Sequence, residues 1–185
     1  MLPDHPAADD PLAGGLSHTQ TLALLWQATP ALPDGAELAE LNRRAVTLLA
    51  VLGSLEEPPP PPDESPQLAA HLQRLDFKLD LLLDLVGRWL SREQPLPAAQ
   101  AVRLGLRGVV WQADLPAGPG LVSLYLRAGL PAPLQLPAQL RPLGDGQVLA
   151  EFQLLDQPLV EALQRYLFRC HRRAVAQARR PASHS

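Results

Sequence analysis

Apolar residues recur along residues 65–93 at alternating steps of four and three, the heptad pattern of a helix that packs against another helix. The positions of this seam are Leu68, Leu72, Leu75, Leu79, Leu82, Val86 and Trp89. Further apolar residues beside the seam widen it, which favours a higher-order bundle, or a dimer that also packs on neighbouring elements. The pattern predicts self-association through residues 65–93, although a long core helix of a monomer has the same pattern.

A second helix is predicted after Asp34, which suits an N-cap. Its apolar face consists of Leu38, Leu41, Ala45, Leu48, Leu49 and Leu52. Gly53 stands where a glycine would end this helix. We interpret residues 34–93 as one helical oligomerisation module. Residues 1–33 are rich in Pro, Ala, Asp and Gly, and we expect a largely flexible segment with a short helix around residues 19–28.

C-terminal to the seam the period changes from helical to alternating, which is typical of strands. The strand candidates are residues 102–106, 109–111, 121–126, 134–140 and 148–154. The Gly-Asp-Gly sequence at 144–146 is a strong hairpin signal between the last two. A final helix is expected from about Pro158 to Gln177, with Cys170 on its apolar stripe. The fold class is therefore α+β: N-terminal helices, then a small antiparallel barrel or sandwich with a C-terminal helix over residues 96–178, and a tail at 179–185.

Composition and charge narrow the function classes. Apolar residues make up 46% of the 185 residues but aromatic residues only 4%, so the core must be aliphatic. Residues 1–64 contain ten acidic and two basic side chains, whereas residues 94–185 contain ten arginines, no lysine and five acidic side chains. The C-terminal part is the one suited to an anion. Charged residues interrupt the seam, so we expect no membrane insertion there. The N-terminal region has no basic segment followed by a long apolar run, so we expect a cytoplasmic protein without a signal peptide.

The sequence contains no motif for catalysis or metal binding. Cys170 is the single cysteine and the five histidines are scattered, so no thiolate or histidine metal site follows from their spacing. Asp76, Asp80 and Asp84 share one helix face, but basic neighbours make a solvated face the simpler interpretation. We therefore expect no enzyme activity, no metal and no cofactor.

Several segments, taken in order, resemble a known family. They are Arg103-Leu104-Gly105-Leu106-Arg107-Gly108, the Gly-Asp-Gly hairpin, Phe152-Gln153-Leu154-Leu155, and a helix with Leu163-Gln164-Arg165-Tyr166-Leu167 and His171-Arg172-Arg173. Together they resemble the PilZ domain, and the preceding heptad helix resembles that of an atypical PilZ subgroup. The resemblance implies a six-stranded β-barrel with a C-terminal helix, cyclic di-GMP as the ligand of the family, and tetramerisation through a helical bundle.

The nucleotide-binding pattern of the family is matched only in part. Receptors of this family have Arg-x-x-x-Arg before the barrel and Asp/Asn-x-Ser-x-x-Gly on a strand. With Gly108 aligned, Arg103 takes the place of Asp/Asn and Gly105 that of Ser. Arg-x-x-x-Arg occurs within the seam helix at residues 88–92, and again from Arg103 to Arg107, where both side chains would lie on one strand face. Arg103, Arg107 and Gly108 are thus the candidate nucleotide site, which we interpret as degenerate.

The sequence favours a non-enzymatic PilZ-type signalling adaptor that forms a dimer or tetramer through residues 65–93 and binds a protein partner. One alternative is a cyclic di-GMP receptor that binds the dinucleotide weakly or atypically through Arg103, Arg107 and nearby arginines. Another is a nucleic-acid-binding protein that uses the basic C-terminal helix. The near absence of lysine, and of exposed aromatic residues for base stacking, argues against nucleic acid.

Overall fold

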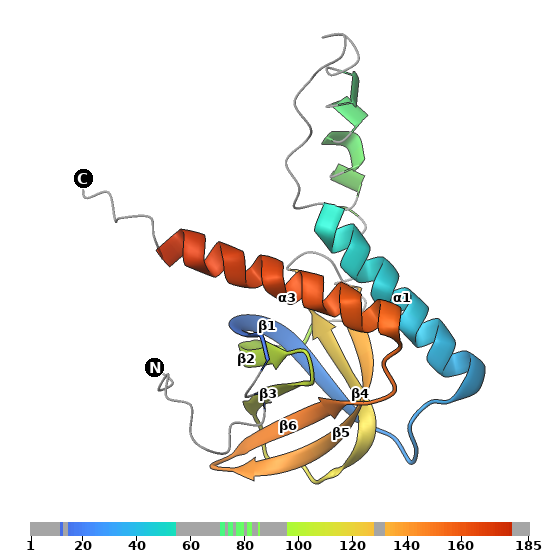
Figure 1. Ribbon diagram of the computed structural model, residues 1–185, viewed down its shortest axis with the longest axis vertical. Coiled ribbons are helices and arrows are strands. Elements are labelled where there is room, and N and C mark those ends of the chain that lie inside the picture. Colours follow the sequence, from blue (N-terminus) through green and yellow to red (C-terminus); the bar gives the residue numbers. More distant parts are fainter. Residues whose placement is uncertain are drawn as a thin grey trace.

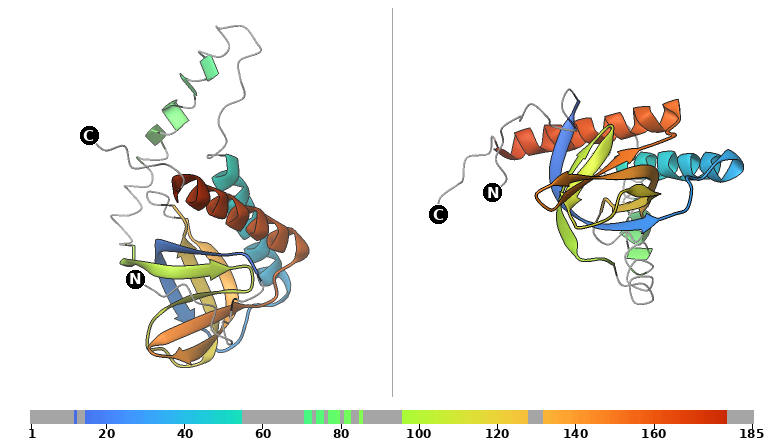
Figure 2. Two further views of the ribbon diagram at one scale, coloured as in Figure 1. Left: turned by 60° about the vertical axis from the view of Figure 1, so that its left-hand side comes forward. Right: turned by 90° about the horizontal axis from the view of Figure 1, so that it is seen from below.

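The computed structural model describes residues 12, 15–54, 96–127 and 132–178, and in the seam helix residues 71, 72, 74, 75, 77–79, 81, 82 and 85. Six antiparallel strands close into a barrel, and the helices α1 (Gly35–Ser54) and α3 (Gln157–Ala178) pack on it (Figure 1). Figure 2 shows both helices on the same side of the barrel. The predicted α+β class, with a small antiparallel barrel and a C-terminal helix, is confirmed.

The strands are β1 (Ser17–Ala28), β2 (Ala99–Gly105), β3 (Gly108–Gln112), β4 (Gly118–Tyr125), β5 (Leu134–Gly144) and β6 (Gln147–Phe152). Their hydrogen-bonded order is β1-β2-β3-β6-β5-β4, and β1 also pairs with β4 to close the ring. Strands β2 to β6 match the alternating segments of the sequence. The β5–β6 hairpin turns at residues 144–146, where the φ angles are 87°, 49° and 69°, the left-handed region that favours glycine.

Alternate residues of the strands fill the barrel interior. Those with at most 1% of their surface exposed are Val102, Leu104, Val109, Val122, Leu124, Leu134, Leu136, Ala138, Leu140, Val148 and Ala150. Aliphatic side chains thus supply most of this core, as the composition predicts. The residues between them face the outside of the barrel, where the candidate nucleotide site lies.

Strand β1 corrects the prediction for the N-terminal region. The sequence predicts a short helix around residues 19–28 in a largely flexible segment, whereas these residues form a strand that pairs with both β2 and β4. The helical interpretation places Leu22 with Leu25 on one face, but Leu22 and Leu24 alternate into the core. A short apolar run fits both periods. The barrel therefore begins at β1, and the boundary expected at residue 96 omits a strand.

Helix α1 covers the barrel instead of forming a separate module with the seam helix, which corrects the prediction for residues 34–93. Its apolar residues Ala45, Leu49 and Leu52 belong to the same buried cluster as the barrel interior. The helix packs against β5 and α3. An amphipathic pattern shows that a helix has a buried face but does not specify the surface that buries it.

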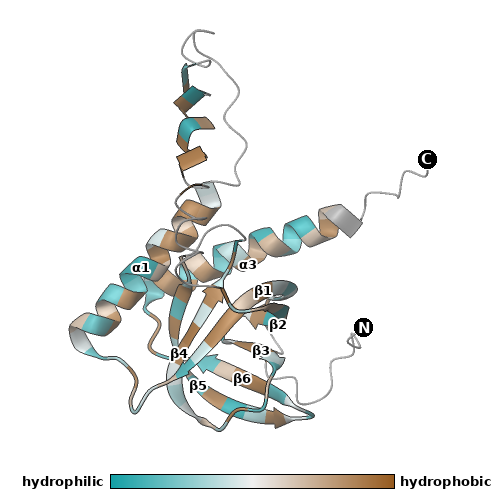
Figure 3. Cartoon of the chain, turned by 180° about the vertical axis from the view of Figure 1, so that it is seen from behind, coloured by the Kyte–Doolittle hydropathy of each residue, from teal (hydrophilic) through white to brown (hydrophobic). Residues whose placement is uncertain are grey.

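Helix α3 begins at a side-chain cap and is tied to α1 at that point. Asp156 Oδ1 accepts a hydrogen bond from the Leu159 backbone N–H at 3.0 Å. Just before this cap, the Asn42 side-chain amide on α1 donates to the Leu154 carbonyl oxygen at 3.1 Å. Cys170 is buried on the apolar face of α3, as predicted. Figure 3 shows hydrophilic as well as hydrophobic residues on both helices, as expected of helices that are covered on one side.

Candidate functional site

Arg103 lies on the outer face of β2, opposite Val110 of β3 in the strand register. Its neighbours along the chain point into the barrel, so Arg103 points outward, where it is half-buried. Arg107 does not share this face as the sequence predicts. Strand β2 ends at Gly105, and Arg107 lies in the turn before β3 and is exposed. The two arginines of the candidate site therefore do not form a pair on one strand.

The close packing of β3 against β6 explains why residue 108 is a glycine. It is the first residue of β3 and lies opposite Glu151 of β6. A Cβ on Gly108 would lie 2.6 Å from the Ala150 carbonyl oxygen and 2.9 Å from Leu149 Cδ1. No other residue fits at these distances unless the strands move apart. The glycine that the motif shares with this chain is thus required by the barrel and is not by itself evidence of ligand binding.

Gly105 lies beneath the side chain of Leu12, a contact that sequence reasoning missed. A Cβ on Gly105 would lie 3.3 Å from Leu12 Cδ2 and 3.4 Å from Leu12 Cδ1. Leu12 is 5% exposed and clusters with Val110 of β3 and Leu149 of β6, apart from the barrel core. We call Leu12, Gly105, Val110 and Leu149 the outer apolar cluster. A single leucine in a segment rich in Pro and Asp has no period that could have predicted this position.

Charged residues border the outer apolar cluster on both sides. The strand register gives a row from Arg103 through Val110 and Leu149 to Arg141, across β2, β3, β6 and β5. Arg141 Nη2 pairs with Glu151 Oε2 at 3.2 Å. This face is therefore apolar in the middle and has guanidinium groups at its edges, whereas the aligned motif would place a hydroxyl group in the middle.

Part of the basic face of α3 is used to pack the two helices together. A Cβ on Gly53 of α1 would lie 3.0 Å from both Nη1 and Nη2 of Arg169, so this guanidinium group lies against the α1 backbone. Gly53 does not end α1 as the sequence predicts, because the helix continues through Ser54 and the glycine serves this close approach. Arg165 lies 4.0 Å from Glu161 on the exposed side. The Arg169 guanidinium group thus packs against α1 and does not contribute to a basic surface of α3 that could bind nucleic acid.

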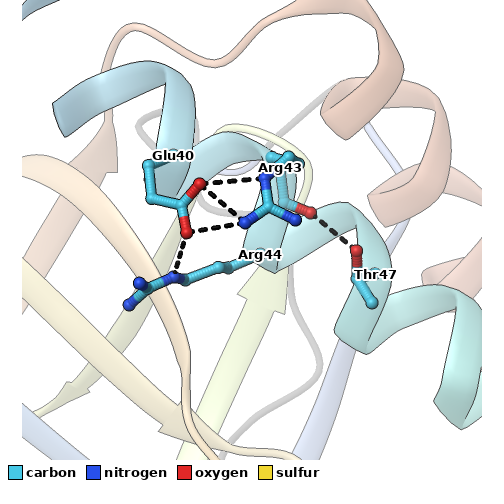
Figure 4. A network of polar contacts seen from close by, with 4 residues as sticks. All are labelled: Glu40, Arg43, Arg44 and Thr47. Carbon is cyan, nitrogen blue, oxygen red and sulfur yellow. Dashed lines mark hydrogen bonds and ion pairs between the residues drawn. The ribbon is translucent and has the colours of Figure 1, made fainter. Parts of the chain in front are cut away.

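An exposed network of ion pairs lies on α1 (Figure 4). Glu40 accepts hydrogen bonds from Arg43 Nε at 2.8 Å and from Arg44 Nε at 2.6 Å. Thr47 Oγ1 donates to the Arg43 carbonyl oxygen at 3.0 Å. The hydrogen bonds from Arg43, and then the one from Arg44, hold the pKa of Glu40 below its ordinary value. All these charges are exposed to water, so we interpret the network as a solvated helix face.

His18 of β1 lies close enough to His171 of α3 for their charges to interact. Burial of the His18 imidazole lowers its pKa, and the charge of His171 lowers it further. His18 is therefore held in its neutral form more strongly than a free histidine. Within the ranges that the structure describes, no three His, Cys, Asp or Glu side chains are grouped in a way that could hold a metal ion.

The described part of the seam helix exposes its apolar side chains. Those of the seam itself, each between 44% and 57% exposed, are Leu72, Leu75, Leu79 and Leu82. Those beside the seam are Phe77, Leu81 and Leu85. Figure 1 shows this part of the helix clear of the barrel, and Leu68, Val86 and Trp89 lie outside the described residues. A row of exposed leucines is typical of a surface that another protein chain covers.

Comparison with known proteins decides the family. Residues 47–180, well over half of the chain, match the family model described as an atypical PilZ domain, cyclic di-GMP receptor. The chain belongs to the atypical PilZ family. The matched range contains β2 to β6 and α3 but not β1. The strand that completes this PilZ barrel therefore lies N-terminal to the matched residues.

A solved structure is similar to nearly the whole of this chain. It is that of a pathogenic protein from Xanthomonas campestris, described as a tetrameric PilZ domain self-assembled through an unusual helical bundle. The two chains are 32% identical with a TM-score of 0.67, and the likeness covers 88% of this chain and 92% of that one. No curated protein matches this chain. Among the described residues, no helix is long and apolar enough to cross a membrane.

Proposed function

We propose that this protein is a self-associating PilZ adaptor without enzyme activity, and that its nucleotide site is degenerate. It forms a dimer or tetramer through residues 65–93, and the assembled protein binds a protein partner. The observation that carries the proposal is the seam of exposed leucines on a chain of the PilZ family.

The seam supports self-association because its four described leucines are about half exposed in the single chain. Full burial of an exposed leucine side chain stabilises by roughly 1.5–3 kcal/mol, so covering these half-exposed side chains would contribute about half of that for each leucine and favour association. Phe77, Leu81 and Leu85 form a second stripe at steps of four, and a helix with two apolar stripes can contact two neighbours in a bundle. The helical bundle described for the Xanthomonas campestris tetramer supports the higher stoichiometry.

The outer apolar cluster supports a degenerate nucleotide site. A receptor for a doubly charged dinucleotide needs paired cations at the phosphates and polar groups at the guanine edge. Gly105 has no side-chain donor, and the methyl groups of Leu12 lie over it. Each missing hydrogen bond to a desolvated group costs roughly 1–3 kcal/mol, and every 1.4 kcal/mol is about tenfold in affinity. Two such losses would move a micromolar site toward millimolar affinity.

A second candidate is a cyclic di-GMP receptor that uses Arg103, Arg107 and nearby arginines. It is favoured by the description of the family as a cyclic di-GMP receptor and by the half-buried position of Arg103 beside the outer apolar cluster. In this case the dinucleotide would displace Leu12 or bind next to it. Binding that depends on both arginines would distinguish this candidate from the adaptor.

Light scattering during size-exclusion chromatography tests the self-association. We expect the wild-type chain to be a dimer or tetramer and the Leu75→Asp/Leu82→Asp variant to be a monomer, because burial of unpaired charge in the seam is unfavourable. Leu143→Asp is the matched control, since Leu143 is an exposed leucine at the end of β5, outside the seam. It should leave the oligomer intact. A monomeric wild-type chain would contradict the proposal.

A further inference from the structure

The outer apolar cluster has the form of a binding site for one side chain. Gly105, Val110 and Leu149 lie on the successively paired strands β2, β3 and β6, and we call these three residues the Leu12 seat. The absence of a side chain on Gly105 lets Leu12 approach the strand. Leu12 itself is N-terminal to every strand of the barrel. Three paired strands of the barrel therefore contact a leucine that lies N-terminal to all of them.

Charges around the Leu12 seat complement the sequence that precedes Leu12. In the strand row, Arg103 and Arg141 stand on either side of the seat, and Arg141 also pairs with Glu151 of β6. In the sequence, Asp9 and Asp10 come shortly before Leu12. An acidic segment that ends in a leucine thus matches an apolar seat with guanidinium groups at its edges.

We propose that the Leu12 seat is a docking site for an acidic peptide with a leucine anchor, and that the N-terminal segment of the chain itself is the resident occupant. The inference rests on the proposed function, because the seat occupies the place where the family motif would bind the dinucleotide. The leucine contributes apolar burial, and the neighbouring carboxylates contribute an attraction that salt weakens. A partner with the same pattern docks by replacing the resident segment.

A free peptide would compete with the resident segment for the Leu12 seat, and this competition can be measured. A tethered occupant acts at an effective concentration of roughly millimolar, so a free peptide must bind the wild-type chain more weakly than a chain whose anchor is removed. Leu12→Asp removes the anchor. It leaves the barrel interior unchanged, because Leu12 belongs to the outer apolar cluster and not to the main core.

The experiment uses the full-length chain and a fluorescein-labelled peptide with the sequence of residues 4–16. Fluorescence anisotropy should show saturable binding to the Leu12→Asp chain and binding to the wild-type chain that is about tenfold weaker or more. The peptide with Leu12→Asp should not bind, and added salt should weaken the binding of the native peptide. Gly105→Val in the Leu12→Asp chain is the control for the seat, since the three atoms nearest to the Cβ position of Gly105 all belong to Leu12. This change should abolish binding.

Equal binding of the native and the Leu12→Asp peptides would overturn the inference. So would the absence of binding to a Leu12→Asp chain that circular dichroism shows to be folded. If that chain does not fold, Leu12→Ala allows the same comparison with a smaller loss of apolar contact. A parallel titration of the wild-type chain with cyclic di-GMP separates the two proposals. Failure of both ligands to bind contradicts the docking site alone, whereas dinucleotide binding contradicts the degenerate nucleotide site of the proposed function.

Discussion

The methyl groups of Leu12 lie over Gly105, 3.3 and 3.4 Å from the point where a Cβ of that residue would stand. The contact joins the N-terminal region to a barrel strand at the position where the PilZ motif has a serine. Because Gly105 has no side chain, Leu12 reaches Val110 and Leu149 and completes an apolar cluster outside the core. The same glycine therefore removes the serine hydroxyl group of the motif and makes room for Leu12.

Gly108→Ala should destabilise the barrel, because the new Cβ would lie 2.6 Å from the Ala150 carbonyl oxygen on β6. Relief of this overlap requires paired strands to shift, and overpacking of this kind costs roughly 1–3 kcal/mol. Gly118→Ala is the matched control, since nothing lies within 4 Å of its Cβ position. Urea unfolding gives both free energies of unfolding. An equal effect of the two substitutions would refute the packing explanation for Gly108.

The contact between Gly53 and Arg169 predicts that the two residues are coupled. Gly53→Ala should gain helix propensity, by less than the roughly 1 kcal/mol of a helix interior because Gly53 is the penultimate residue of α1, but its Cβ would displace the guanidinium group of Arg169. The gain in unfolding free energy should therefore be larger in an Arg169→Ala background. A double-mutant cycle measures this difference, for which we expect at least about 0.5 kcal/mol. Strict additivity would show that the guanidinium group does not constrain α1.

The lowered pKa of His18 predicts that the protein loses stability in mild acid. Burial, and to a lesser extent His171, holds the folded-state pKa below the ordinary value of 6.5. The unfolded chain then binds more protons than the folded chain, so the free energy of unfolding decreases as the pH falls through that value. Urea unfolding at about pH 7.5 and about pH 5.5 measures the decrease. His18→Gln should diminish it and His171→Gln should diminish it less; an unchanged decrease in His18→Gln would disprove the assignment.

Local patterns predict most of the barrel but not how it closes. The alternation in β2 to β6 and the turn at residues 144–146 depend on neighbouring residues, so they are visible in the sequence. Strand β1 pairs with β2 across the whole of α1 and the seam helix, and nothing within residues 17–28 specifies that partner. The apolar face of α1 likewise fits equally well a helix that packs with the seam helix and a helix that packs on the barrel.

The candidate site is also predictable from the sequence only in part. Residue identity alone shows that Gly105 lacks a hydroxyl group and that Gly108 keeps the glycine of the motif. The occupant of the space above Gly105, and the reason why Gly108 tolerates no side chain, depend on Leu12 and Ala150, which only the folded chain brings near. Apolar and polar residues continue to alternate past the end of β2, so the sequence places Arg107 on that strand although it lies in the following turn.

Titration calorimetry with cyclic di-GMP tests most directly the central claim that this PilZ face does not bind the dinucleotide. We expect no saturable heat at micromolar nucleotide, because Gly105 offers no donor and Leu12 lies over it. The Arg103→Ala/Arg107→Ala variant should then behave as the wild-type chain does. Saturable micromolar binding that disappears in this variant would contradict the claim.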